Sequence, residues 1–89
     1  MKIKGEYVLR EIAGDYILVP VGPSALEVNG MITLNEIGVF IWKQLEQGCN
    51  YEELLASITA AYEVQDDQAK MDLDEFLARM KEANLIADE

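Results

Sequence analysis

The residue types that most often carry enzyme chemistry are scarce in this chain. It contains no histidine, which removes the usual general base, the Ser-His and Cys-His nucleophile pairs and most zinc sites. Its single cysteine, Cys49, follows the predicted end of a helix, where the helix dipole opposes thiolate formation, so a structural role is expected. Gly22, Gly30 and Gly38 lack the spacing of a phosphate-binding loop. We therefore expect no catalytic residue and no cofactor.

Two further groups of residues could suggest chemistry. Five acids lie close together in the sequence: Asp66, Asp67, Asp72, Asp74 and Glu75. This stretch has neither the glycine nor the spacing of a calcium-binding loop, so we interpret it as a solvated helix face without a metal site. Ser24, in Pro-Ser-Ala-Leu, weakly matches the modified serine of small acidic carrier proteins, although the acid that precedes the serine in that motif is missing. A carrier protein is kept as an alternative.

Charge and composition limit the partners. Seventeen Asp and Glu residues oppose seven Lys and Arg residues, for a net charge of −10. Proteins that bind nucleic acids gain much of their affinity from Lys and Arg against phosphates, so nucleic acid and anionic membrane surfaces are poor partners. No apolar run is long enough to span a bilayer. The lone cysteine and the lack of an apolar signal core behind Lys2 and Lys4 predict a cytoplasmic protein. A basic or apolar peptide partner is compatible with this charge.

The first third of the chain follows strand patterns. The run from Tyr7 to Ile12 alternates in polarity, and the run from Tyr16 to Val21 is almost continuously apolar, which predicts a central strand that Pro20 ends or bulges. Asn29-Gly30 is a strong hairpin signal, and Met31 to Leu34 completes a three-stranded antiparallel meander. A further short strand at Ala25 to Val28 is left open.

From Asn35 onward the apolar residues follow helical spacing. Asn35 is a helix-capping residue type, and the first helix is predicted to end near Gln47, with Gly48 at a left-handed C-terminal position. Its inward stripe is Ile37, Phe40, Ile41 and Leu45, and Trp42 lies off that stripe, where it would cover a second surface. Asn50 and Glu53 have the spacing of a capping box at the start of a second helix, and a third helix begins near Asp66. After Asn84, Leu85 and Ile86 are expected to fold back onto the core.

These elements predict one α+β domain over residues 1–89, in which a three-stranded antiparallel meander is followed by three helices. The order is compatible with a winged-helix-like fold, in which the third helix would read DNA. That helix carries more acids than bases, which argues against a transcriptional regulator, the second alternative. What remains is the edge of the meander at Met31 to Leu34, which either accepts an extended peptide, as an unpaired strand edge can, or is covered by the chain's own termini.

The chain resembles the PqqD family over nearly its whole length. The resemblance rests on an ordered set of segments: Tyr-Val-Leu-Arg-Glu-Ile, Tyr-Ile-Leu-Val-Pro-Val-Gly, Asn-Gly-Met-Ile-Thr-Leu-Asn-Glu-Ile-Gly-Val-Phe-Ile-Trp, Tyr51 to Leu55, Ala61 to Val64, Asp72 to Phe76 and Ala83 to Ile86. These small proteins were first associated with pyrroloquinoline quinone biosynthesis. Related domains recognise ribosomally made, post-translationally modified peptides. The resemblance implies a peptide chaperone, not an enzyme, that binds the leader of a precursor peptide and presents it to a modifying enzyme, often a radical S-adenosylmethionine enzyme.

The resemblance also implies a binding site. The leader would pair with the backbone of the strand Met31, Ile32, Thr33 and Leu34, in a groove walled by the third helix through Phe76, Leu77, Arg79 and Met80. Arg79 would be available for a carboxylate of the leader. If the Ile32 N–H donates to the peptide, Ile32→Pro should weaken binding. The chain resembles longer variants with an insertion from Gly22 to Gly30, which are not confined to quinone synthesis, so pyrroloquinoline quinone is not the expected end product.

Overall fold

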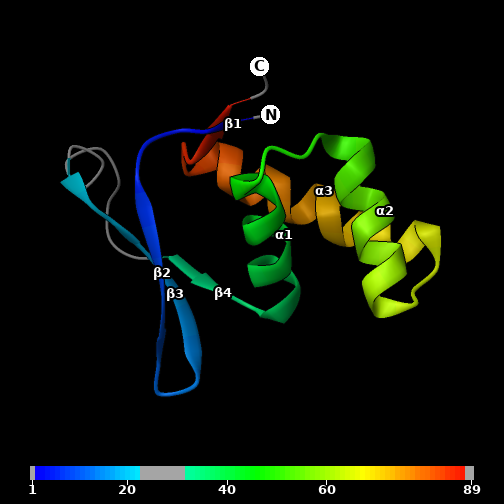
Figure 1. Ribbon diagram of the computed structural model, residues 1–89, viewed down its shortest axis with the longest axis horizontal. Coiled ribbons are helices and arrows are strands. Elements are labelled where there is room, and N and C mark those ends of the chain that lie inside the picture. The colour runs from blue at the N-terminus through cyan, green and yellow to red at the C-terminus, as the bar shows by residue number, and fades with distance from the viewer. Residues whose placement is uncertain (1, 23–31, 88–89) are drawn as a thin grey trace.

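An antiparallel sheet forms the first half of the fold. The computed structural model describes residues 2–22 and 32–87. Strands β2 (Tyr7–Ile12), β3 (Asp15–Pro20) and β4 (Ile32–Leu34) pair in the order β2-β3-β4 (Figure 1). The predicted meander is thus confirmed, with β3 at its centre and ending at Pro20. The expectations for Ala25 to Val28, the Asn29-Gly30 turn and Met31 fall outside the described residues.

Three helices follow the sheet, as the helical spacing predicts: α1 (Glu36–Glu46), α2 (Tyr51–Tyr62) and α3 (Asp66–Glu82). In Figure 1 they stand together on one side of the sheet. Asn35 caps α1 by accepting a hydrogen bond from the Gly38 N–H at 2.8 Å, and Asn50 and Glu53 form the predicted capping box of α2. Gly48, just after α1, has the predicted positive φ of 88°. No described helix is long and apolar enough to cross a membrane.

The Asn35 cap joins β4 to α1, so its loss should be measurable. Asn35→Ala removes the side-chain acceptor for the Gly38 N–H and should lower the free energy of unfolding by about 1 kcal/mol. Asn35→Asp keeps an acceptor at the same place and should stay near the wild type. Urea denaturation of both variants measures the difference, and equal losses in the two would argue against the cap.

The ends of the described chain meet in a second, small sheet that was not predicted. Strand β1 (Lys2–Ile3) pairs antiparallel with β5 (Ile86–Ala87). The Lys4 N–H also donates to the Leu85 carbonyl at 2.7 Å. The expectation that Leu85 and Ile86 fold back onto the core is confirmed, because both side chains are buried.

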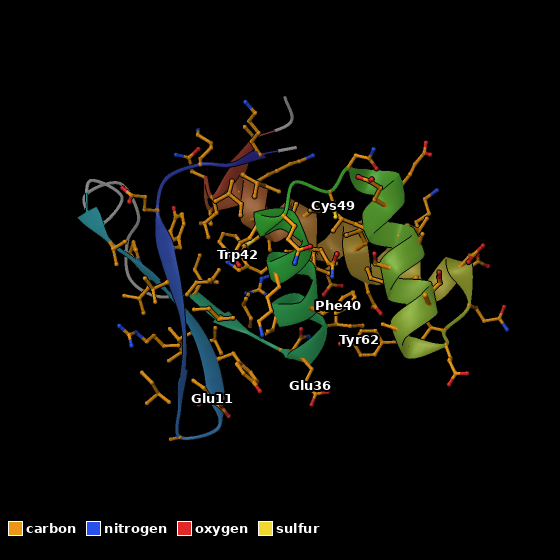
Figure 2. All side chains as sticks on the ribbon, viewed as in Figure 1. Glu11, Glu36, Phe40, Trp42, Cys49 and Tyr62 are labelled. Atoms are coloured by element: carbon orange, nitrogen blue, oxygen red, sulfur yellow. The ribbon has the colours of Figure 1, made fainter. Side chains whose placement is uncertain are left out.

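One hydrophobic core joins the inner face of the sheet to all three helices. Trp42 is 1% exposed and contributes a large side chain to this core. Its ring packs edge-on against the ring of Tyr7 on β2, with 5.7 Å between centroids, so the second surface predicted for Trp42 is the sheet. Figure 2 shows Phe40 and Tyr62 facing each other from α1 and α2, in a similar edge-on contact at 5.4 Å. The sheet and α2 therefore pack on different sides of α1.

Helix α3 is tied to α2 by a polar contact at the surface. The Tyr51 hydroxyl donates to a carboxylate oxygen of Asp74 at 2.5 Å. This hydrogen bond, followed by burial and the negative charge of Asp74, raises the pKa of Tyr51 from 10.0 to about 12. Because the folded-state pKa lies above the unfolded value, the contact stabilises the fold fully below pH 10, and its contribution disappears as the pH rises through 12.

Tyr51→Phe should therefore remove a phenol ionisation near pH 12 from an alkaline absorbance titration. The expected loss of stability at neutral pH is less than about 1 kcal/mol, because the hydrogen bond is exposed to solvent. A variant that keeps the transition near pH 12 would show that another tyrosine is responsible. Asp74→Asn is the complementary variant, since it removes the carboxylate charge and should move the Tyr51 ionisation toward lower pH.

Candidate functional site

Strand β4 lies at an edge of the sheet. Within the described residues it pairs with β3 on one side only. Arg79 and Met80 of α3 and Ile32 of β4 line one hollow, so the helix runs beside the strand's other edge. An unpaired strand edge is a template for adding an extended chain. The chemistry of the site therefore depends on which backbone groups of β4 point to that edge.

The hydrogen-bonding pattern of the sheet identifies the residue that faces the edge. In an antiparallel ladder, opposed residues alternate between pairs that bond to each other and pairs whose backbone groups point away. The Val21 N–H donates to the Glu6 carbonyl at 3.0 Å, so these two residues form a hydrogen-bonded pair just before the ladder of β2 and β3. Every second pair from there on is also hydrogen-bonded, and the pair of Arg10 and Ile17 is one of these. The backbone groups of Ile17 therefore point at β2. Thr33, opposite Ile17 on β4, then directs its own N–H and carbonyl away from β3.

A contact from α3 gives the same assignment independently. A guanidinium nitrogen of Arg79, Nη2, donates to the Thr33 carbonyl at 3.3 Å, so this oxygen does point away from the sheet. Ile32, one residue earlier, has the opposite orientation and faces Leu18 of β3. The condition set for Ile32→Pro, that the Ile32 N–H is the donor at the edge, is therefore not met: the N–H at the free edge belongs to Thr33.

A groove runs between β4 and α3. Its larger part is a hollow of about 300 Å³, lined by Ile32, Arg79, Met80, Glu82 and Ala83. A smaller part of about 50 Å³ is lined by Asn35, Ile37, Asp72, Glu75, Phe76 and Arg79. Arg79 lines both parts and stands between them. The groove thus offers an apolar floor, three carboxylates and one guanidinium beside an unpaired strand edge.

Other hollows exist on the molecule. One of about 370 Å³ lies between β3, α1 and α2, and one of about 430 Å³ lies along the connection from α2 to α3. A third, of about 390 Å³, lies beside the start of β2, which forms the other edge of the sheet. Only at β4, among the described edges, is a helix side chain shown to bond to an outward strand carbonyl. The β4 groove is therefore the best candidate site.

The family model described as "Coenzyme PQQ synthesis protein D (PqqD)" matches residues 16–86. The chain belongs to the PqqD family. The match spans the central strand, β4 and all three helices of this PqqD-family chain, and so includes both walls of the groove. No curated protein sequence matches it.

A solved structure supports the PqqD assignment. The structure described as "TbiB1 in Complex with the TbiA(beta) Leader Peptide" superposes with a TM-score of 0.77 at 27% sequence identity. The alignment covers 100% of this chain and 98% of that chain. The protein in that structure is thus similar to this PqqD-family chain along its whole length, and it holds a leader peptide. Neither of the two matches is to a transcriptional regulator or a carrier protein.

The structure places the predicted site residues in two groups. The side chains of Leu34, Phe76, Leu77 and Met80 are buried in the core of this PqqD-family domain. Phe76 and Met80 still line the groove, while Leu34 and Leu77 line neither of its two parts. The second group, Ile32, Thr33 and Arg79, is accessible at the edge. Met31 lies outside the described residues.

Sequence reasoning missed several residues that line the groove: Asn35, Ile37, Asp72, Glu75, Glu82 and Ala83. The acidic residues of this group on α3 are spaced from Arg79 as residues on one helix face are, since positions 72, 75, 79 and 82 are three or four residues apart. Such residues lie on one face of a helix. This spacing could have indicated the groove side of α3 once Arg79 was chosen.

A close contact between α1 and α3 holds the groove in shape. Gly38 of α1 packs so tightly that a Cβ added there would lie 3.2 Å from the Phe76 ring and 3.4 Å from the Leu34 Cβ. The missing side chain lets α1 lie against both β4 and α3 at the narrow part of the groove. Within the described residues, no group of three or more His, Cys, Asp or Glu side chains could hold a metal ion.

Proposed function

We propose that this chain is a non-catalytic, single-domain peptide chaperone that binds the leader of a ribosomally made precursor peptide. The leader adds to β4 as a further strand, and the chain presents the precursor to a modifying enzyme. The observation that carries the proposal is the orientation of Thr33, whose N–H and carbonyl face an unpaired edge beside α3. The leader peptide in the similar TbiB1 structure supports it. Main-chain hydrogen bonds give such a complex its affinity, and side-chain pockets give it specificity.

The predicted site residues take distinct roles in this proposal. Thr33 supplies the central donor and acceptor, and Met31, which lies outside the described residues, is proposed as a further contact of the leader. Leu34 anchors β4 to the core through its buried side chain, and Leu77 supports α3 from behind. Ile32 and Met80 form the apolar floor of the wider hollow, and Phe76 lies at the narrower one. The wider hollow suits an apolar side chain of the leader.

Arg79 covers the acceptor that an added strand needs. In the structure its guanidinium donates to the Thr33 carbonyl. A leader N–H would take over this carbonyl, and the guanidinium would then be available for a leader carboxylate. Arg79 therefore protects the empty edge from pairing with other chains and contributes to recognition of the filled one.

Replacement of Arg79 separates these two roles. Arg79→Met keeps a side chain of similar reach but loses every donor. It should bind a leader that carries the matching carboxylate about threefold to tenfold more weakly, because a charge-assisted contact is lost. A leader whose carboxylates are replaced by amides should bind Arg79→Met at least as well as the wild type, since no guanidinium has to be displaced. Titration calorimetry of both proteins with both leaders gives the coupling energy between Arg79 and the leader carboxylate. Equal losses of affinity with both leaders would contradict the carboxylate contact.

The experiment that tests the function itself is a titration of this chain with the leader of its precursor, followed by amide chemical shifts. Binding by strand addition predicts the largest shifts at Thr33 and its neighbours on β4 and along the groove side of α3. Shifts confined to the hollow between β3, α1 and α2 would contradict the site. A leader that causes no shift at all would contradict the function.

We infer that the partner enzyme is a radical S-adenosylmethionine enzyme and that the complex forms in the cytoplasm. The first point follows from the enzymes that family members commonly serve. The second is consistent with a lone, half-buried cysteine, as is usual in a reducing compartment. The chain itself needs no cofactor for this role. The gene neighbourhood tests the partner: a short precursor reading frame beside a radical enzyme supports it, and a different class of modifying enzyme there would replace it.

A further inference from the structure

The outer face of the sheet, opposite the helices, carries apolar side chains that are not part of the core. Strand alternation and the register place seven residues on it: Val8, Arg10, Ile12, Asp15, Ile17, Val19 and Thr33. Val8 is 36% exposed and Ile12 is 53% exposed. Among residues 2–22 and 32–87, none of the four aliphatic side chains on this outer face belongs to the core or to the residues packed against it. The inner face, by contrast, buries Leu18 and Leu34.

This distribution is unusual for an antiparallel sheet with one face in solvent. Such a face is normally polar, and the strand then alternates between apolar and polar residues. Single exposed apolar residues need no explanation, and Met71 on α3, which is 66% exposed, is one of them. Here the exposed Val8 and Ile12 and the half-buried Ile17 and Val19 form one contiguous apolar patch on two paired strands, the kind of surface from which interaction sites are built.

The size of the outer face argues against a stable dimer of this chain. A patch about five residues long and three strands wide covers roughly 240 Å². Stable interfaces bury about 800 Å² on each partner. However, the outer face ends at Thr33, whose backbone forms the free edge. A strand added at β4 would widen the face by about 4.8 Å and contribute its own outward side chains.

We propose that the modifying enzyme docks on the outer face and that the bound leader completes its docking surface. This inference rests on the proposed function. The occupant has an apolar surface with a carboxylate for Arg10, because Arg10 lies between Val8 and Ile12 in the middle of the patch. Since leader and enzyme share this surface, each raises the affinity for the other by the same factor. The enzyme thereby distinguishes the loaded chaperone from the empty one. Because the patch on the chaperone is small, the enzyme dissociates readily once the leader has left.

The test uses the purified enzyme that modifies the precursor, together with the leader peptide. Leader affinity is measured by fluorescence anisotropy, and enzyme affinity by surface plasmon resonance on the empty and the loaded chaperone. The wild type should bind the enzyme at least fivefold more tightly when loaded. The double variant Arg10→Glu with Ile12→Ser should lose at least tenfold in enzyme affinity while its leader affinity stays within twofold. Val8→Thr, which keeps the β-branched shape, should lose severalfold.

Met71→Ser is the matched control, because it removes an exposed apolar side chain from α3 instead of the sheet. It should change neither affinity. The proposal is overturned if the double variant binds the enzyme normally, or if the wild type binds it equally well when empty and loaded. It is also overturned if sedimentation shows a dimer of the chain that the double variant abolishes. A wild type that does not bind the leader would instead overturn the proposed function.

Discussion

Thr33→Pro should abolish most of the leader affinity and leave the domain folded. Proline removes the one β4 N–H assigned to the free edge, and its ring blocks close approach of an added strand. Because the Thr33 N–H points away from β3, the sheet itself loses no ladder bond. Loss of this bond and weakening of its neighbour should cost about 1.4–2.8 kcal/mol, which corresponds to a dissociation constant roughly tenfold to a hundredfold higher. Calorimetric titration with the leader measures it.

Two controls make this result specific. Thr33→Ala removes the side chain but keeps the N–H, and should bind nearly as well as the wild type. Glu11→Pro removes an outward N–H from β2, since Glu11 alternates with Arg10 on the other edge of the sheet, and should leave binding unchanged. A loss of affinity in Glu11→Pro with none in Thr33→Pro would move the site to β2. Ile32→Pro should destabilise the fold instead, because its N–H faces β3.

Trp42→Ala should cause the largest loss of stability. Truncation of a fully buried tryptophan costs about 3–5 kcal/mol, through lost contacts and the cavity that remains. In a domain of this size, that loss lowers the unfolding midpoint by at least about 12 °C. Thermal unfolding followed by circular dichroism measures it. Retention of the wild-type midpoint would show that α1 does not depend on its contact with the sheet.

Trp42→Phe separates ring packing from the indole N–H. The Nε1 N–H of Trp42 is buried without a hydrogen-bond partner in the described part of the chain, so its removal carries no lost bond. Phenylalanine keeps a ring against Tyr7 and should cost less than about 2 kcal/mol. Leader binding should raise the stability of both variants, by about 2.7 kcal/mol at a hundredfold excess over the dissociation constant. Such a gain would show that both variants still bind the leader in the folded state.

Local signals made the fold largely predictable from the sequence. Asn35, Asn50 and Gly48 act through hydrogen bonds and backbone angles within three or four residues, so their types and spacing suffice to locate helix ends. The almost continuous apolarity before Pro20 likewise indicated the central strand. The pairing of β1 with β5 was not predictable, because two-residue strands have no periodicity and their partners lie at opposite ends of the chain.

The site was less predictable because its geometry is set by tertiary contacts. Only the register of β4 against β3 decides whether Ile32 or Thr33 faces the free edge, and that register depends on the connection that precedes β4. The family resemblance indicated β4 and α3, yet it selected buried residues such as Leu77 together with accessible ones. Glu82 and Ala83 were missed although they lie three and four residues after Arg79, a spacing that places them on the same face of α3.

The pairing of Lys2 with Ala87 has a practical consequence. Both ends of the described chain emerge at the same place, as Figure 1 shows, so a tether attached to either one starts at the same distance from β4. A precursor or enzyme fused through a flexible linker of matched length would experience a millimolar effective concentration, whichever end is used. A short peptide joining the two ends would circularise the domain and reduce the entropy of its unfolded state. The fold thus offers a compact module for covalent assembly of peptide-modifying systems.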